Sequence, residues 1–218
     1  MLHPAAVALY GAPAGTRPPV SRKAVCGSTM TQVLEVVRAH LRGYFAGQDP
    51  DSASVTFLGV ERIEVLRFGP DADGLIHYVS LGCSRHPMGD PTQLAADPLQ
   101  GPRAEVVVSM RDSAPTPGLA RAIAILAATP AVDGVVLQQD ALIDLGATLW
   151  EGARVSAVIL GAGEIPDVPL DPPREPVRFL TATPISANEA AWVRLKGIDE
   201  LRRTWEQDGV DVRDPARL

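Results

Sequence analysis

The sequence predicts a single α/β domain of the α+β type, with a mixed, largely antiparallel β-sheet flanked by helices. The apolar segments alternate between strand-like and helix-like periodicity, without the strict strand–helix–strand rhythm of a parallel fold. The chain has 218 residues, of which 46% are hydrophobic and 21% are charged. That length and composition suffice for one domain with a substantial core, and we expect the domain to span residues 30–209.

The two ends of the chain differ from this domain. Residues 1–29 are rich in proline and carry three basic side chains but no acidic one, so we expect a disordered N-terminal arm. The apolar run at 5–10 is too short for the core of a signal peptide. Met30 directly precedes a helical pattern and is a second candidate start of translation. Residues 210–218 read as a polar tail.

Periodicity assigns the elements in order along the chain. Helices are expected over 31–46, from a Thr116–Pro117 start to Pro130, from a capping box at Ser186–Glu189 to Gly197, and over 198–209. Strands are expected over 55–60, 63–68, 75–82, 104–111, 154–160 and 177–183, with a further short one at 135–137. The turn residues of 69–74 join two of these strands into a hairpin.

Polar and reactive side chains are concentrated at the end of the strand predicted over 75–82. His, Cys, Ser, Arg and Asp side chains follow one another within 77–90, where the strand breaks into a loop closed by proline and glycine. Functional side chains are disproportionately carried by loops on rigid strands. We therefore expect any site to lie at this strand-to-loop corner.

One interpretation of the corner is a small hydrolase. Cys83 or Ser84 would be the nucleophile, His86 the base, and Asp90 the acid that orients the base. Against this, catalytic triads are usually assembled from distant segments, and Pro87 disfavours the helix that follows the serine in a nucleophile elbow. A loop whose polar residues have no catalytic role is the other interpretation.

Metal and cofactor chemistry have weaker support. His77, His86 and Asp90 could share a metal ion, but one histidine on a strand and one on a loop form a spacing of little specificity. The segment 158–163 begins like a dinucleotide fingerprint, yet the sixth position of that motif falls on Pro166 in a proline-rich loop. The sequence therefore predicts no metal site and no bound cofactor.

Charge and hydropathy limit the classes of partner. The formal net charge is −6 and no Lys/Arg cluster is present, whereas a duplex nucleic-acid binder usually carries a basic face. The sequence contains no run of about 18 apolar residues, so we expect no membrane span. The two cysteines, Cys26 and Cys83, do not suggest a disulfide, because the first lies in the expected arm. We therefore expect a cytoplasmic protein with neither nucleic acid nor membrane as its partner.

Three stretches together resemble the suppressor of fused family. They are His77–Ser84 with Gly89–Asp90, Arg103–Val108, and Val177–Ile185 with Glu189, Gly197 and Leu201. Their order and spacing agree with the family from about Met30 to Trp205. The chain is similar to a short prokaryotic-type member, which corresponds to the N-terminal lobe of the eukaryotic protein.

The resemblance implies a non-enzymatic binding domain. Eukaryotic members hold Gli transcription factors through an extended peptide that adds a strand between two lobes, so that backbone bonds supply affinity and side-chain pockets supply selectivity. The positions that match the family's binding residues are Tyr78, Asp90 and Glu105. The second lobe is missing here, and the segment 85–88 replaces a more acidic and aromatic stretch, so a Gli partner is not expected.

The resemblance also indicates what kind of partner to expect. Bacterial members are thought to include immunity proteins of toxin systems, in which an acidic surface would cover a basic toxin. We therefore expect a domain that binds a protein or peptide, as an immunity protein or as a regulator. The rival hypothesis is the hydrolase that uses Cys83, Ser84 or His86. Glu105 lies on the polar side of an apolar strand, where a carboxylate is usually solvated; the alternative is that it meets a partner, if that face of the strand lines a groove.

Overall fold

The computed structural model describes residues 22–56, 62–89, 97 and 99–217. Within these residues, seven strands form one sheet in the order β1-β2-β3-β4-β7-β6-β5. Neighbouring strands are antiparallel except β4 and β7, which are parallel. The strands are β1 (Asp51–Val55), β2 (Ile63–Phe68), β3 (Leu75–Leu81), β4 (Arg103–Arg111), β5 (Leu142–Asp144), β6 (Val155–Ala162) and β7 (Val177–Ser186). The predicted mixed, largely antiparallel sheet is confirmed, as is the hairpin of β2 and β3.

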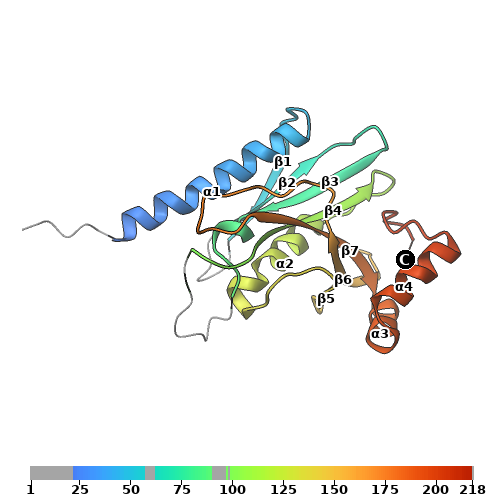
Figure 1. Cartoon of the computed structure of the whole chain (residues 1–218). Coiled ribbons are helices and arrows are strands. Elements are labelled where there is room, and N and C mark those ends of the chain that lie inside the picture. Colours follow the sequence, from blue (N-terminus) through green and yellow to red (C-terminus); the bar gives the residue numbers. More distant parts are fainter. Residues whose placement is uncertain (1–21, 57–61, 90–96, 98, 218) are drawn as a thin grey trace, which may run out of the picture.

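Helices cover both faces of this sheet. They are α1 (Arg22–Tyr44), α2 (Leu119–Asp133), α3 (Ala187–Lys196) and α4 (Ile198–Asp208), and a short 3-10 helix, η1 (Cys83–Arg85), follows β3. Figure 1 shows α1 above the β1–β4 half of the sheet, α2 below the sheet, and α3 and α4 at the β6–β7 end. We call the two sides of the sheet the α1 face and the α2 face.

Three apolar clusters join the helices to the sheet. The cluster on the α2 face is the largest and joins Val106, Val108 and Leu160 of the sheet to Leu119, Ile123 and Leu126 of α2. The cluster on the α1 face includes Val79, Val107 and Phe179 against Val33, Val37 and Leu41, which recur at helical spacing along α1. In the third cluster, Ala157, Ile159 and Ile185 pack against residues of α3 and α4.

Strand alternation places the third cluster on the same side of the sheet as α1. On β6, Val158 and Leu160 pack on the α2 face, so Ile159 between them points to the α1 face. Two separate helical layers therefore cover the α1 face, α1 at one end and α3 with α4 at the other. The middle strip of that face, over β4 and β7, lies between them (Figure 1).

The boundaries of α1 and α2 differ from the sequence prediction. Helix α1 begins at Arg22, nine residues before the predicted start, so residues 22–29 of the expected arm are helical. Nothing between Arg22 and Tyr44 is a proline, and the two glycines in the helix lower its propensity without breaking it. Residues 1–21 of that arm lie outside the described residues.

Helix α2 starts at Leu119, after Gly118, and has no side-chain cap, so the predicted cap at Thr116 was wrong. It also continues through Pro130 and ends at Gly134, which adopts the left-handed conformation at φ 68°. Pro130 costs the helix one backbone hydrogen bond, because proline has no N–H to donate. The helix continues for only three more residues before Gly134 ends it.

The sequence predicted the positions of the short strands less accurately than those of the long strands. Strand β1 ends at Val55, where the predicted strand 55–60 begins, and residues 57–60 lie outside the described part of the chain. Residues 135–137 are not a strand, and β5 was not predicted at all. By contrast, the capping box at Ser186 and Glu189 is confirmed in both directions.

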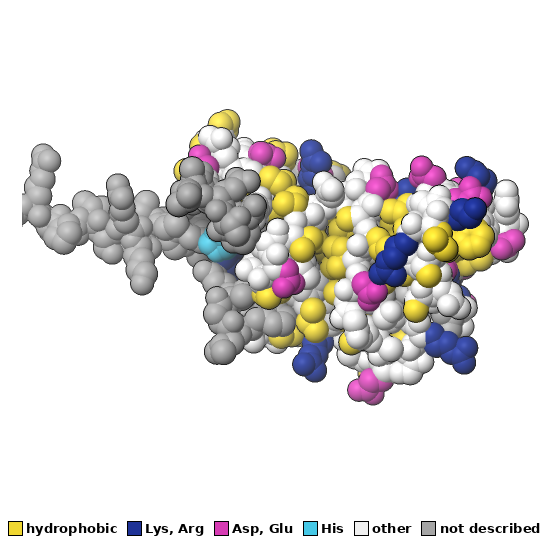
Figure 2. Space-filling model, turned by 90° about the horizontal axis from the view of Figure 1, so that it is seen from below, with side chains coloured by type: hydrophobic (Ala, Val, Ile, Leu, Met, Phe, Trp, Pro, Cys, Tyr) yellow, Lys and Arg dark blue, Asp and Glu magenta, His cyan; other side chains and the backbone are white. Residues whose placement is uncertain are grey.

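Side chains of both charges are spread over the α2 side of the molecule. Viewed from below, Figure 2 shows basic and acidic side chains interspersed with apolar ones. The exposed apolar residues on and after α2 include Ile125, Val132 and Val135. This face therefore differs from the continuous basic face of a duplex nucleic-acid binder.

Candidate functional site

The strand-to-loop corner after β3 is held from inside by a buried carboxylate. Glu105 of β4 is fully buried. Its Oε1 accepts hydrogen bonds from the backbone N–H groups of Gly82 (2.9 Å) and Ser84 (3.0 Å) and from Ser84 Oγ (2.6 Å). Its Oε2 accepts a hydrogen bond from Ser80 Oγ. The expectation that Glu105 is solvated was therefore wrong.

A second charged side chain of β4 holds the other side of the same turn. Arg103 is 3% exposed, and its Nη1 donates to the carbonyl oxygens of Ser84 (2.8 Å) and Arg85 (2.9 Å). Glu105 thus binds the donors of the turn and Arg103 its acceptors. The turn also requires glycine at Gly82, which has φ 141°.

The two candidate nucleophiles of the corner, Cys83 and Ser84, are both buried. Burial, followed by the nearby Glu105 charge, raises the pKa of the Cys83 thiol well above its ordinary value, so the nucleophilic thiolate is disfavoured. The Ser84 hydroxyl is buried and donates to Glu105. Burial also raises the pKa of Glu105, against the lowering effect of its four hydrogen bonds. These groups stabilise the turn, and His86 lies exposed at the end of it.

Of the three predicted binding residues, the two that the structure describes, Tyr78 and Glu105, point to opposite faces of the sheet. Tyr78 is partly buried on the α2 face, and its hydroxyl lies 3.4 Å from Thr116 Oγ1. Glu105 points to the α1 face, because Val106 beside it packs on the α2 face. Asp90 lies outside the described residues. Direct contact of these residues with a partner stays a prediction.

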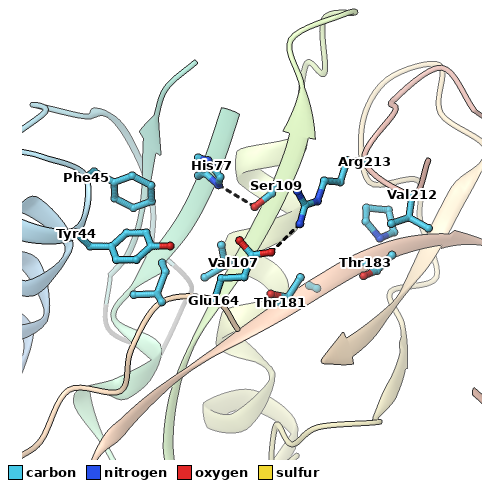
Figure 3. Close-up of a pocket in the computed structure, with 13 residues that line it drawn as sticks. Tyr44, Phe45, His77, Val107, Ser109, Glu164, Thr181, Thr183, Val212 and Arg213 are labelled. Carbon is cyan, nitrogen blue, oxygen red and sulfur yellow. Dashed lines mark hydrogen bonds and ion pairs between the residues drawn. The ribbon is translucent and has the colours of Figure 1, made fainter. Parts of the chain in front are cut away.

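At the other end of β3 and β4, polar side chains face an open groove on the α1 face. His77 and Ser109 are direct neighbours in the β3–β4 register, and His77 Nδ1 lies 2.9 Å from Ser109 Oγ. The other ring nitrogen, Nε2, lies 2.9 Å from Asp71 Oδ2. Figure 3 shows His77 and Ser109 side by side at the groove. Because the Asp71 carboxylate can only accept, Nε2 carries the proton and donates to it, and in neutral His77 Nδ1 accepts from the Ser109 hydroxyl.

The groove lies in the strip that the two helical layers leave uncovered. Its volume is about 130 Å³, and its floor includes Val107 and Ser109 of β4 with Thr181 and Thr183 of β7. The aromatic side chains of Tyr44 and Phe45 form one wall (Figure 3). An ion pair forms the opposite wall, where Arg213 Nη2 lies 2.7 Å from Glu164 Oε1.

The C-terminal segment helps to shape this groove. The backbone N–H of Arg111 donates to the carbonyl oxygen of Arg213 (2.8 Å), which places residues 212–213 beside the end of β4. Arg217 then returns to the sheet, where its guanidinium binds Glu189 and the carbonyl oxygen of Pro184. Part of the stretch read as a polar tail therefore lines the groove.

Sequence reasoning missed the groove, although each of its strands carried a signal. Ser109, Thr181 and Thr183 are polar positions within apolar strands, on the side opposite the main core. They become one surface only through the parallel pairing of β4 with β7, in which Val107 lies opposite Thr181. Nothing in the local sequence specifies that pairing.

A metal site and a membrane span have no support within the described residues. No group of three or more His, Cys, Asp or Glu side chains there could hold a metal ion. No helix in the same part of the chain is both long and apolar enough to span a bilayer.

The chain is similar to proteins of a known family. The family model for the suppressor of fused protein (SUFU) matches residues 59–218. The chain belongs to the suppressor of fused family. The match includes the corner, the β4–β7 floor of the groove and the C-terminal segment, while α1 precedes it.

Solved structures share the SUFU fold at low sequence identity. A SUFU homologue from Neisseria gonorrhoeae is 18% identical with a TM-score of 0.63, and the match covers 86% of this chain and 96% of that one. The Sufu protein of a Sufu–Fu complex is 13% identical with a TM-score of 0.60, covering 85% and 90% of the two chains.

Drosophila Suppressor of Fused is 14% identical with a TM-score of 0.60, and here the match covers 85% of this chain but 50% of the fly protein. No curated protein matches this chain.

Proposed function

We propose that this chain works by binding another protein, and that an extended segment of the partner lies in the groove on the α1 face. The groove itself carries the proposal, because it is an uncovered strip of sheet with an aromatic wall and a floor of hydroxyl groups. The family supports it, since a SUFU relative has been solved in complex with the protein Fu. The proposal includes a cytoplasmic location and no catalytic activity.

The groove offers both kinds of contact that peptide recognition uses. Tyr44 is 44% exposed at the wall, and exposed aromatic side chains are typical anchors of protein interfaces. Ser109, Thr181 and Thr183 are partly exposed on the floor, where their hydroxyls can donate to or accept from a peptide backbone. The groove would therefore hold an apolar side chain against Tyr44 and a peptide backbone over the floor.

Binding in the groove differs from strand addition. Strands β4 and β7 beneath the groove each pair with neighbours on both sides, so their backbone groups are already used. Among the described strands, the edges are β1 and β5. A partner segment in the groove would be recognised by side chains, whereas strand addition would have to use one of those edges.

An affinity experiment with matched variants tests the proposal. The full chain is used as bait in lysate of the source cell, beside a groove variant (Tyr44→Ala with Thr183→Arg) and a control variant (Val132→Ser, exposed on α2). We expect one stoichiometric protein to be retained by the wild type and the control but not by the groove variant. Equal retention by all three would contradict the groove, and no retained protein would contradict protein binding. Circular dichroism checks that each variant is folded.

The biological role of such binding is a separate question. The net charge of −6 favours a basic partner, as an immunity protein would require. If the role is immunity, co-expression of this chain should restore growth to cells that produce the toxin encoded beside it, and the groove variant should not. If the role is regulation, the retained protein should be non-toxic when expressed alone.

A further inference from the structure

The hydrogen bonds around His77 determine how the Ser109 hydroxyl is presented to the groove. His77 Nε2 donates to Asp71 Oδ2 and Nδ1 accepts from Ser109 Oγ, each over 2.9 Å. Figure 3 shows the bond between His77 and Ser109 at the edge of the groove. Because a hydroxyl has a single hydrogen, this bond uses the donor of Ser109 and leaves only its lone pairs for a ligand.

Asp71 is itself held in place by the turn between β2 and β3. Its Oδ1 accepts from the backbone N–H groups of Asp73 (2.9 Å) and Leu75 (2.8 Å), which leaves Oδ2 for His77. The Leu75 bond is the main cause that lowers the pKa of Asp71; burial opposes it, and the bonds from His77 and Asp73 add to it. Asp71 is therefore an ionised carboxylate at neutral pH, which can accept but not donate.

The three hydroxyls on the floor of the groove differ as a result. Within the described part of the chain, no side-chain hydrogen bond fixes the hydroxyls of Thr181 and Thr183, so each can rotate to donate or to accept. Ser109 is fixed as an acceptor by His77. A partner group directly over Ser109 makes a hydrogen bond only if it is a donor, since a second acceptor there would oppose the serine lone pairs.

We propose that Asp71 and His77 are positioning residues that make the groove selective for a hydrogen-bond donor over Ser109, such as a backbone N–H of the partner segment. This inference rests on the function proposed above, because it states what the partner segment must present. The aromatic wall at Tyr44 would hold an apolar side chain of the same segment. A segment that presents a carboxylate or a carbonyl oxygen over Ser109 would be rejected.

The substitution Asp71→Asn should reverse this selectivity. The amide oxygen of the new side chain can keep both bonds of the turn, which places its NH₂ group where Oδ2 now faces His77. Because NH₂ can only donate, Nε2 would have to accept and Nδ1 would carry the proton. Nδ1 would then donate to Ser109 Oγ, and the serine hydrogen would turn towards the groove. Asp71 is not a lining residue, so the groove itself keeps its composition.

Two small probes that differ in one group measure the selectivity. N-methyl-3-phenylpropanamide carries one N–H and a phenyl ring, and methyl 3-phenylpropanoate is the matching ester, in which an oxygen replaces the N–H. The full chain is titrated with each at about pH 8, above the range in which an imidazole is normally charged. Backbone amide NMR signals of β4 and β7 report binding. Long-range 1H–15N correlation spectra show which nitrogen of His77 carries the proton, and His77→Gln assigns these signals.

We expect the proton of wild-type His77 on Nε2, and the amide should bind at least about threefold more tightly than the ester, with dissociation constants on the order of 1–10 mM. In Asp71→Asn the proton should move to Nδ1 and the amide should lose its advantage. Ser109→Ala should also abolish the advantage. Ser52→Ala, at an exposed serine of β1, is the matched control and should leave it unchanged.

A proton on Nδ1 in the wild type, equal binding of amide and ester, or an unchanged preference in Asp71→Asn would overturn this inference and leave the groove as a binding site. If neither probe shifts the signals of the groove, the groove is contradicted and this inference with it. Ser109→Ala tests the selectivity even if Asp71→Asn does not fold.

Discussion

The two ends of the β3–β4 pair carry similar polar residues, but these residues differ in burial and in the contacts that they make. At the corner end, Ser80 and Glu105 are fully buried, and their hydrogen bonds reach the backbone of the turn and of β4. At the groove end, His77 and Ser109 are partly exposed and bind each other at the edge of an open surface. The comparison shows that polar side chains on the same strands stabilise the fold where they are enclosed and are available for recognition where they are not.

The largest effect should come from removing the buried carboxylate. Glu105→Ala leaves two backbone N–H groups and two hydroxyls without their acceptor, so the free energy of unfolding should fall by about 3–5 kcal/mol. Urea unfolding followed by circular dichroism measures this change. The exposed Glu175→Ala is the control and should change stability by less than about 0.5 kcal/mol. If Glu105→Ala costs less than about 1 kcal/mol, the corner is not held by Glu105.

A substitution at Gly82 tests whether close packing of the turn contributes to the stability of the corner. In Gly82→Ala, the added Cβ would lie 3.0 Å from Ile63 Cδ1 and 3.1 Å from the Arg62 carbonyl oxygen, at φ 141°. We expect a loss of about 1–3 kcal/mol in unfolding free energy. Gly152 also has a positive φ, but no atom lies within 4 Å of the Cβ that Gly152→Ala would add. The loss of unfolding free energy in this variant therefore measures the backbone strain alone, without crowding. Equal losses would show that crowding at Gly82 contributes nothing.

Glu189 extends the comparison to a carboxylate that is only partly enclosed. Burial alone would raise its pKa, but hydrogen bonds from the Ser186 backbone, Trp205 and Arg217 outweigh this and lower it. A lowered pKa stabilises the fold above the ordinary value of 4.5, and this stabilisation is lost as the pH falls through the folded-state pKa.

Glu189→Gln should therefore cost about 1–2 kcal/mol at pH 7, and the difference from wild type should shrink as the pH falls below the ordinary value of 4.5. Urea unfolding at a series of pH values measures it. A difference that stays constant from pH 7 to pH 3 would show that the Glu189 charge is not what stabilises this helix start.

Features that depend on local sequence were predicted well. The alternation of β3, the hairpin turn and the Ser186–Glu189 capping box are each specified by residues that are close in the chain. Glu105 was misjudged because its hydrogen-bond partners lie on β3 and the turn after it, more than 20 positions away. A carboxylate in an apolar strand looks solvated until those partners are known.

The groove escaped prediction for the same reason. Its floor depends on the parallel contact of β4 with β7, and its far wall on a C-terminal segment that returns to the sheet. The end of α2 was also ambiguous in the local sequence. Pro130 was expected to end the helix but lies within it, and Gly134 ends it instead. Long-range pairing therefore decides which polar residues line a surface, and a single sequence does not show that pairing.

The smallest effect should come from Ser109, and a matched serine at the other end of the strand pair makes it informative. Ser109→Ala removes one hydrogen bond to His77 at a partly exposed position, so we expect a loss of less than about 1 kcal/mol. Ser80→Ala removes a buried hydroxyl that donates to Glu105 and accepts from the Val106 N–H, so we expect about 1–3 kcal/mol. Urea unfolding of both variants measures the difference, and partner retention should be weakened by Ser109→Ala alone. If Ser109→Ala is the more destabilising of the two, the groove end is part of the structural framework, and the distinction between the two ends of these strands is wrong.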